Sequence, residues 1–162
     1  MAQQLYDVVI IGGGPSGSYA AYELAASGYS VAVLERESAP GLNVCCTGII
    51  SKECFDSFGI SPEVILTKCR SASFFSPSGR CLRLGTENVQ AYVVDRVLFD
   101  RTVAAKAQAQ GAEFLFGFQG NGISIAKGEA KVEALHGSSR EIFSARSVIL
   151  ANGFKPELPQ RL

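Results

Sequence analysis

Short apolar runs broken by glycine dominate the opening of the chain, and their pattern predicts a strand, a helix and a second strand. Residues 5–11 form a nearly continuous apolar, largely β-branched run that ends at glycine, which is typical of a buried strand. Over residues 16–27, alanine and leucine recur at helical spacing. Pro15 suits the first turn of this helix, and Gly28 suits the position just after its end. Residues 29–35 predict the second strand, so the opening is a β-α-β unit.

The middle of the chain changes from helical to strand-rich patterns. Residues 49–58 predict a short helix, and residues 71–86 predict two strands joined by a turn cluster at residues 77–79. Residues 92–117 predict a strand, a helix and a further strand. The apolar side of that helix is predicted to hold Val97, Val103 and Ala104.

The last third of the chain predicts a β-meander followed by one more strand. Residues 121–146 alternate as three short strands with turns at Lys127-Gly128 and Gly137-Ser138, and a short strand over residues 147–150 then returns to the first sheet. His136 lies near a turn, and no serine or acid is spaced to form a triad with it. We therefore interpret it as a surface residue.

Composition narrows the function classes. The chain has 162 residues, of which 47% are hydrophobic, and 15 basic residues balance 15 acidic ones. This predicts one globular domain without the basic surface that nucleic-acid binding needs, so we expect no nucleic-acid partner. We expect no membrane-spanning helix and no secretory signal, because the apolar runs are short and the first residues lack a basic segment. Five cysteines without a C-x-x-C pair favour a reducing compartment, and we expect a cytoplasmic protein.

Three glycines in the first turn carry the clearest chemical signal. Gly12, Gly14 and Gly17 have the G-x-G-x-x-G spacing of a dinucleotide-binding loop. Gly12 permits a tight turn, Gly14 allows backbone to approach a pyrophosphate, and Gly17 allows close packing of the helix on the sheet. The helix N-terminus offers N–H groups to the phosphates, and Glu35 is placed to bind an adenosine ribose. The alternative is a glycine-rich turn in an unrelated α/β protein.

Two stretches resemble known flavoproteins. The segment "GGGPSG" with the later "LER" resembles the FAD-binding opening of glutathione-reductase-type flavoproteins. The segment "YVVDRVLFDRTVAAKAQAQGAEFLFG" is similar to one in the group that contains geranylgeranyl reductases and aromatic-ring hydroxylases. This resemblance implies that Arg96 lies against FAD. The alternative is that Arg96 is simply a residue at the N-terminus of a helix, where it forms a salt bridge with Asp95 or Asp100.

Residues 39–60 are most similar to the geranylgeranyl reductase family, in which a Cys-x-Gly stretch approaches the flavin. Cys46, Thr47 and Gly48 match that stretch. The resemblance implies that the Cys46 thiol contacts the substrate or tunes the flavin, so Cys46 is the candidate catalytic residue. An inert cysteine is the alternative, and a redox pair with Cys45 is a less favoured one. The remaining cysteines, Cys54, Cys69 and Cys81, are predicted to lie in the core. No spacing of cysteines suggests a zinc site.

The segment "SVILANG" resembles the strand and A-D-G turn that pass near FAD in this family. Asn152 replaces the usual acid, and Gly153 keeps the backbone position. The resemblance covers nearly the whole chain but only the first part of a family member. The later G-D segment and most of the substrate cavity are missing, so we expect either a fragment or a chain that a second polypeptide completes. Exposed apolar surface would then favour self-association.

The predicted fold class is α/β, a Rossmann-like FAD-binding βαβ domain with a β-meander insertion that is incomplete at its C-terminal end. Residues 1–162 form this partial domain. Within it, residues 39–60 are the flavin- and substrate-side loop and helix, residues 69–94 are strands leading toward a substrate domain, and residues 121–146 are the β-meander. The predicted cofactor-binding residues are Gly12, Gly14, Pro15, Ser16, Gly17, Glu35, Arg36, Gly48, Arg96 and Gly153.

The resemblance implies an FAD-dependent oxidoreductase that reduces isoprenoid carbon–carbon double bonds with hydride from reduced flavin. Electrons would come from NADPH or a ferredoxin, and a lipid substrate implies work at a peripheral membrane surface. One alternative is a flavin monooxygenase or halogenase, a class that shares the opening and Arg96 but lacks the Cys-x-Gly loop. The other is a dinucleotide-binding fragment without catalysis.

Overall fold

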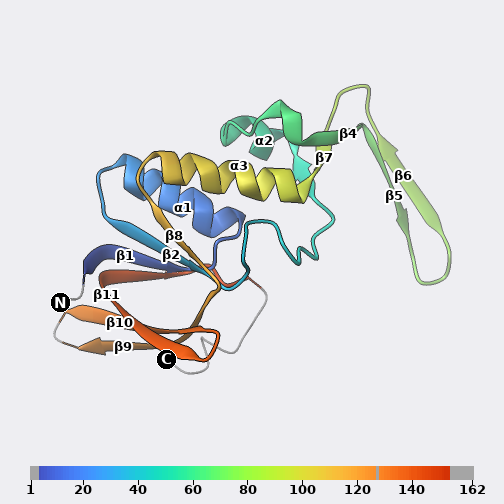
Figure 1. Ribbon diagram of the computed structural model, residues 1–162. Coiled ribbons are helices and arrows are strands. Elements are labelled where there is room, and N and C mark those ends of the chain that lie inside the picture. Colours follow the sequence, from blue (N-terminus) through green and yellow to red (C-terminus); the bar gives the residue numbers. More distant parts are fainter. Residues whose placement is uncertain (1–3, 127, 154–162) are drawn as a thin grey trace. The chain divides into compact units, whose positions relative to one another are not determined.

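The computed structural model describes residues 4–126 and 128–153 (Figure 1). The chain divides into two compact units, Met1–Asn43 with Asp100–Leu162 and Val44–Phe99. In chain order the elements are β1 (Leu5–Ile11), α1 (Pro15–Ala26), β2 (Val31–Glu35), β3 (Ile49–Ser51), α2 (Lys52–Ser57), the 3-10 helix η1 (Pro62–Val64), β4 (Ile65–Cys69), β5 (Ser71–Phe75), β6 (Cys81–Gly85), β7 (Ala91–Val94), α3 (Arg96–Ala109), β8 (Glu113–Phe116), β9 (Phe118–Ala126), β10 (Glu129–His136) and β11 (Ser139–Leu150).

The first unit is built on one mixed sheet with the strand order β8-β2-β1-β11-β10-β9. Strand β1 pairs in parallel with β2 and with β11, and β2 pairs in parallel with β8. Strand β10 pairs antiparallel with β9 and β11. The predicted β-α-β opening is confirmed, and Gly28 follows the helix end with a φ of 86°. The Rossmann-like fold class is therefore confirmed.

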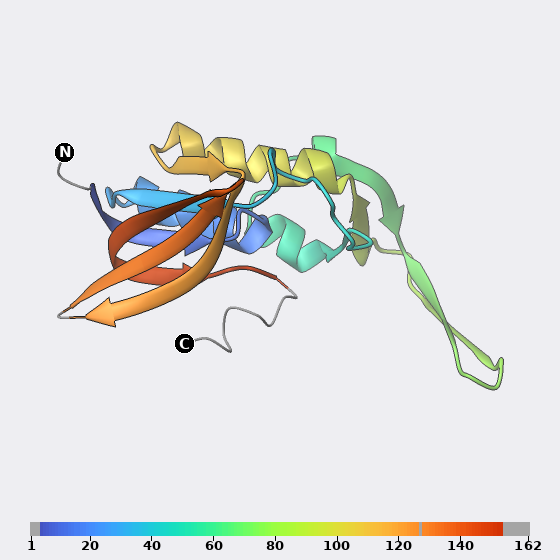
Figure 2. The same ribbon diagram turned by 60° about the horizontal axis from the view of Figure 1, so that its bottom comes forward.

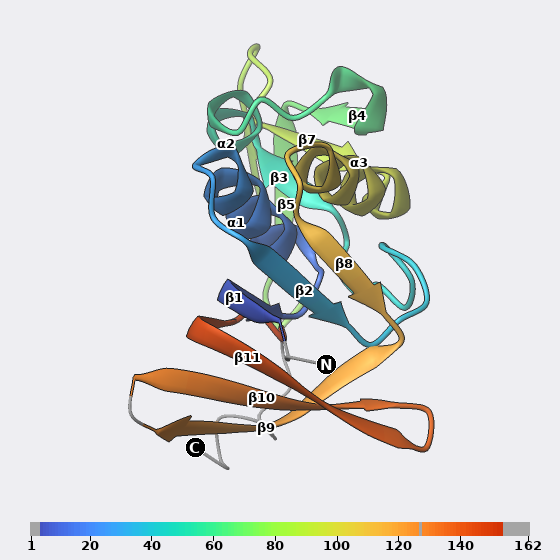
Figure 3. The same ribbon diagram turned by 60° about the vertical axis from the view of Figure 1, so that its left-hand side comes forward.

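The parallel part of this sheet is covered on both faces (Figure 3). Because side chains alternate along a strand, β1 contributes to two separate cores. Val8 and Ile10 pack with buried alanines of α1 and α3, while Val9 and Ile11 pack with residues of β9, β10 and β11. A parallel strand buried on both faces needs a continuous apolar sequence, which explains the run at residues 5–11.

The β-meander and the returning strand are one element rather than two. β11 pairs antiparallel with β10 and then parallel with β1, so that Ala145 lies opposite both Ala130 and Tyr6. Figure 2 shows this long strand running without a break from the β10–β11 turn into the parallel sheet. The strand predicted over residues 147–150 is therefore present and pairs with β1, but it is the second half of β11 rather than a short strand of its own. The predicted turn at 137–138 is present, whereas Lys127 of the other turn lies outside the described residues.

The apolar side predicted for α3 is confirmed at Ala104, Val103 is half-buried, and the prediction fails at Val97. Phe99, Ala104 and Ala107 are buried, whereas Val97 is exposed. Val97 lies in the first turn of α3, whose sequence neighbours do not reveal which side is covered. None of the helices in the described ranges is long and apolar enough to cross a membrane.

The second unit contains a small antiparallel sheet with the order β3-β7-β4. The ring of Phe55 on α2 packs on that of Tyr92 on β7, with centroids 4.6 Å apart, and Val64 and Val94 are buried. The helix predicted over residues 49–58 begins only at residue 52, because the preceding residues pair with β7 as β3. Ser51 ends this strand and caps α2, accepting a hydrogen bond from the Cys54 N–H at 3.1 Å.

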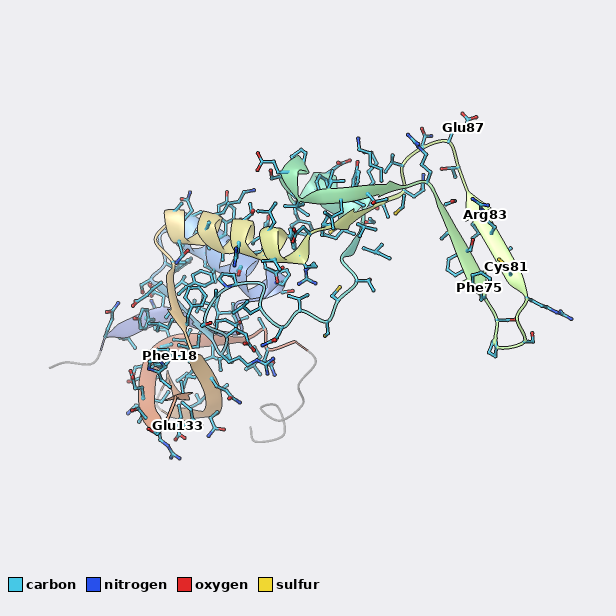
Figure 4. The ribbon with its side chains drawn as sticks, turned by 45° about the vertical axis from the view of Figure 1, so that its right-hand side comes forward. Phe75, Cys81, Arg83, Glu87, Phe118 and Glu133 are labelled. Carbon is cyan, nitrogen blue, oxygen red and sulfur yellow. The ribbon has the colours of Figure 1, made fainter. Side chains whose placement is uncertain are left out.

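Strands β5 and β6 form a separate hairpin, as the sequence predicts, with its turn at residues 77–79. Every residue of both strands is exposed, and Phe75 keeps 73% of its surface. Figure 4 labels Phe75, Cys81 and Arg83 along this hairpin. The core position predicted for Cys81 is therefore wrong, because the described residues of its own unit provide no second layer over the hairpin. Cys54 and Cys69 are only half-buried.

Candidate functional site

The glycine loop between β1 and α1 is packed against its surroundings at two positions. Gly12 has a φ of +106°, and a Cβ added there would lie 2.3 Å from the Ala151 carbonyl oxygen. A Cβ on Gly17 would lie 1.9 Å from the Gly12 carbonyl oxygen. Both distances are far below van der Waals contact, so these two glycines are required by the fold itself. The close helix–sheet packing expected at Gly17 is present.

Gly14 differs, because a Cβ there would meet nothing within 4 Å. It is the N-cap of α1 and has an extended backbone, with φ −70° and ψ −174°. Its carbonyl accepts the Ser18 N–H at 2.9 Å, which starts the helix. Pro15 at the first helical position has no N–H, so the N–H groups of Ser16 and Gly17 are those that a helix N-terminus offers to an anion.

The Glu35 carboxylate supports the same loop from the end of β2. Its Oε2 accepts the Gly13 N–H at 2.7 Å, and its Oε1 accepts the Glu37 N–H at 2.9 Å. Each carboxylate oxygen has a second lone pair, so hydrogen bonds to ribose hydroxyls remain open to it. Sequence reasoning missed the bond to Gly13, because spacing suggests a ligand for Glu35 but not a partner inside the loop.

The returning strand β11 closes the loop from another side. The Ala151 N–H donates to the Ile11 carbonyl at 2.8 Å, and this places the Ala151 carbonyl against Gly12. The close backbone approach is therefore at Ala151. Gly153 has a φ of +65° with open space beside it, so its contact with a cofactor stays a prediction.

Two ionisable groups with clearly shifted pKa values, Tyr6 and Asp7, lie at the far end of β1 from the glycine loop. Burial, followed by the hydrogen bond from the Tyr6 hydroxyl to Glu113 at 2.7 Å, raises the pKa of Tyr6 to about 12. Hydrogen bonds from the Ser30 backbone N–H and hydroxyl lower the pKa of Asp7 below its usual value. Both contacts join strands of the sheet, so we assign them to the scaffold.

The second unit brings together Cys46 and Gly48 of the Cys-x-Gly stretch and Arg96, which the sequence analysis singled out in a separate segment. The Gly48 N–H donates to the Cys46 sulfur at 3.5 Å, and the Gly48 carbonyl accepts the Val94 N–H at 2.9 Å. Gly48 has a φ of +75°, and a Cβ there would lie 2.6 Å from the Val94 carbonyl oxygen and 3.2 Å from Cγ of Arg96. Gly48 is buried, whereas Cys46 is exposed.

Arg96 begins α3 directly after β7. Its guanidinium carbon lies 6.0 Å from the centroid of the Phe99 ring, within the range of a cation–π contact. Asp95 caps the same helix, because its Oδ1 accepts the Leu98 N–H at 3.0 Å. This cap fixes the first turn of α3. An exposed thiol, a buried glycine turn and a helix-terminal cation therefore share one region of the second unit.

Comparison with known proteins agrees with this geometry. Residues 6–161 match the family model described as pyridine nucleotide-disulphide oxidoreductase. The chain is 41% identical over 114 residues to digeranylgeranylglycerophospholipid reductase 2 of Methanothermobacter thermautotrophicus, covering 68% of this chain and 29% of that protein. It is 37% identical over 112 residues to geranylgeranyl diphosphate reductase of Rhodobacter capsulatus, covering 69% and 28%.

A solved structure gives the same result for the fold. The geranylgeranyl bacteriochlorophyll reductase-like protein of Thermoplasma acidophilum superposes with a TM-score of 0.87 at 28% identity. The match covers 99% of this chain and 42% of that protein. The chain therefore spans less than half the length of these relatives.

Proposed function

The chain belongs to the pyridine nucleotide-disulphide oxidoreductase family, and we propose that it is the cofactor-binding part of an FAD-dependent reductase that saturates isoprenoid double bonds. The proposed activity is that of a whole protein, and these residues match 42% of the related solved chain. Two relatives, a digeranylgeranylglycerophospholipid reductase and a geranylgeranyl diphosphate reductase, support an isoprenoid lipid as the substrate class.

The open space at Gly14 is the observation that carries FAD binding. Gly12 and Gly17 are filled by the protein's own backbone, whereas Gly14 leaves room beside the N-terminus of a twelve-residue helix. A pyrophosphate suits this place, because it would receive backbone N–H groups and the positive end of the helix dipole. Glu35 at the end of β2 is bonded to Gly13 of the same loop, so Glu35 and the adjacent Arg36 are proposed to bind the adenosine half.

The second unit would serve the flavin half. When bound and reduced, FAD supplies the hydride for the reduction. We propose that the Cys46 thiol contacts the substrate double bond or the flavin and that Arg96 supplies a positive charge beside them. Gly48 lies beside both residues, because its N–H donates to the Cys46 sulfur and a Cβ there would lie 3.2 Å from Cγ of Arg96. This group of residues favours a reductase over a flavin monooxygenase or halogenase, because the resemblance described in the sequence analysis implies that the latter class lacks the Cys-x-Gly loop.

The substrate class bears on where the protein works. Isoprenoid lipids partition into membranes, so we propose a cytoplasmic protein that meets its substrate at the membrane surface. The exposed apolar hairpin β5–β6 is compatible with such contact or with self-association. Flotation with vesicles of the lipid substrate and light scattering of the protein alone distinguish the two. The electron donor we propose is NADPH or a ferredoxin.

The deciding experiment uses the whole protein loaded with FAD and reduced with dithionite without oxygen, which removes the question of the donor. Geranylgeranyl diphosphate and a digeranylgeranylglycerol phospholipid are offered in parallel, and the products are analysed by mass spectrometry. Gain of hydrogen across the double bonds supports the proposal. Insertion of oxygen or halogen in air would point to the rival class, and a protein that retains no flavin would identify a non-catalytic fragment.

Neighbouring cysteines provide matched variants for this assay. Cys45 and Cys46 are both exposed and adjacent, so Cys45→Ser controls for the loss of a thiol in the same loop. We expect Cys46→Ser to bind FAD normally and to lose most reductase turnover, while Cys45→Ser stays close to the parent. Equal turnover of all three proteins would remove Cys46 from the reaction.

A further inference from the structure

Glu37 makes four polar interactions in the loop that follows β2. Its N–H donates to Glu35 Oε1 at 2.9 Å, and its carbonyl accepts the Gly117 N–H at 3.1 Å. Its side chain pairs Oε1 with Arg36 Nε at 3.1 Å, while Oε2 accepts the Asn43 side-chain N–H at 2.8 Å. All five residues belong to the first unit.

These interactions converge on the two residues that are predicted to bind the adenosine half of the cofactor. Glu35 is held through the Glu37 backbone, and Arg36 is held through the Glu37 side chain. The contact to Arg36 joins Glu37 Oε1 to the Arg36 Nε, and a guanidinium carries further N–H donors on its two terminal nitrogens. The side chain of Asn43 donates to the other carboxylate oxygen of Glu37 and so fixes it, and Asn43 itself has a φ of 53°.

We propose that Glu37 is a positioning residue for cofactor binding: its carboxylate orients the Arg36 guanidinium toward the adenosine end of the dinucleotide. The proposal rests on the proposed FAD function. An ion pair whose cation keeps 38% of its side chain exposed adds little to stability. Its main effect is therefore expected on Arg36 rather than on folding.

Glu37→Gln is the sharpest substitution, because it keeps the size of the side chain and leaves both backbone bonds intact. A carboxamide has an NH₂ group in place of one carboxylate oxygen, so it cannot accept at both of these positions, and it has no charge to pair with Arg36. Glu133→Gln is the matched control. Glu133 lies on β10, where Figure 4 labels it, and it pairs with Arg140 at 3.2 Å with 33% of its side chain exposed.

The experiment is a double-mutant cycle on the whole protein with FAD and with ADP, which lacks the flavin half, as probes. Dissociation constants are measured for the parent, Glu37→Gln, Arg36→Ala, the double variant and Glu133→Gln. We expect Glu37→Gln to weaken both ligands about threefold to tenfold in the parent background and to have no effect once Arg36 is alanine. Glu133→Gln is expected to match the parent, and the melting temperatures of all five proteins are recorded.

Each outcome decides between specific alternatives. An equal loss of affinity in both backgrounds, or a loss that follows the melting temperature, would show that Glu37 acts through general loop stability and would overturn the positioning role. Unchanged affinity of Glu37→Gln would also overturn it while leaving the proposed function intact. A parent protein that binds neither FAD nor ADP would refute the proposed function and this inference with it.

Discussion

Replacing Gly14 by alanine is expected to separate cofactor binding from folding. The backbone at Gly14, with φ −70° and ψ −174°, is one that alanine adopts freely, and the new Cβ would meet nothing within 4 Å. Gly17→Ala is the contrasting variant in the same loop. Its Cβ would lie 1.9 Å from the Gly12 carbonyl oxygen, so backbone must move before the helix can pack.

The magnitudes follow from these contacts. Compared with glycine, alanine at position 14 loses less backbone entropy on folding, which stabilises the protein by about 0.4–1 kcal/mol. Alanine is also a poorer N-cap than glycine, by a similar amount. The free energy of unfolding should therefore change by less than about 1 kcal/mol. The methyl group would displace a phosphate from its backbone donor. Loss of one hydrogen bond to a charged group costs about 1.5–3 kcal/mol, or roughly a 10- to 150-fold rise in Kd. Gly17→Ala should lower the free energy of unfolding by about 1–3 kcal/mol or more.

The assay combines urea denaturation with FAD titration followed by quenching of flavin fluorescence. Gly122→Ala on β9 is the control, because its Cβ would make an ordinary contact with Glu133 at 3.9 Å. This control should match the parent in both measurements. Undiminished FAD binding by Gly14→Ala would refute the phosphate-loop assignment, and unfolding of that variant would refute the claim that the space beside Gly14 is open.

Three further predictions test the supporting residues. Glu35→Ala should weaken FAD by about 1–3 kcal/mol in calorimetric titration, and unchanged affinity would move the ribose contact elsewhere. Gly48→Ala should lower the free energy of unfolding by about 1–3 kcal/mol, since its Cβ would lie 2.6 Å from the Val94 carbonyl oxygen; an unchanged urea midpoint would contradict this. Because burial and then the hydrogen bond to Glu113 raise the folded pKa of Tyr6 from 10.0 to about 12, the protonated Tyr6 side chain contributes stability below pH 10 that is lost as pH rises toward 12. Tyr6→Phe should remove the phenolate absorbance change near pH 12 and flatten that alkaline loss, whereas the same titration curve in both proteins would exclude Tyr6.

The opening of the fold could be predicted because local rules decide it. The apolar run of β1, Pro15 at the start of α1 and Gly28 after its end act within a few residues of chain, and the structure confirms all three. The extent of β11 could not be predicted in this way. A strand that leaves one partner for another carries no sequence mark at the exchange, because Ala145 is buried in both pairings.

Burial was the property that sequence predicted least reliably in the second unit. Cysteine is usually buried, so Cys81 was expected in the core, yet β5 and β6 form a hairpin with both faces exposed. The same applies to Val97, which is apolar but exposed in the first turn of α3. The type of a side chain indicates whether the residue can be buried. Whether it is buried depends on the layers that distant parts of the chain place over it.

The candidate site shows the same division between local and distant information. Spacing alone identifies Gly12, Gly14 and Gly17 as one motif, but it does not tell which glycine the protein fills and which it leaves for a ligand. That distinction comes from the Ala151 carbonyl, which the last strand brings against Gly12.

Gly48 extends this argument to the second unit. Its carbonyl is bonded to the Val94 N–H, its own N–H donates to Cys46, and a Cβ would press on Arg96. A side chain at this position would therefore displace the thiol and the cation together, although neither residue is altered. Substitutions at Gly48 should consequently reduce the function of both residues at once, which a change at Cys46 or Arg96 alone would not do.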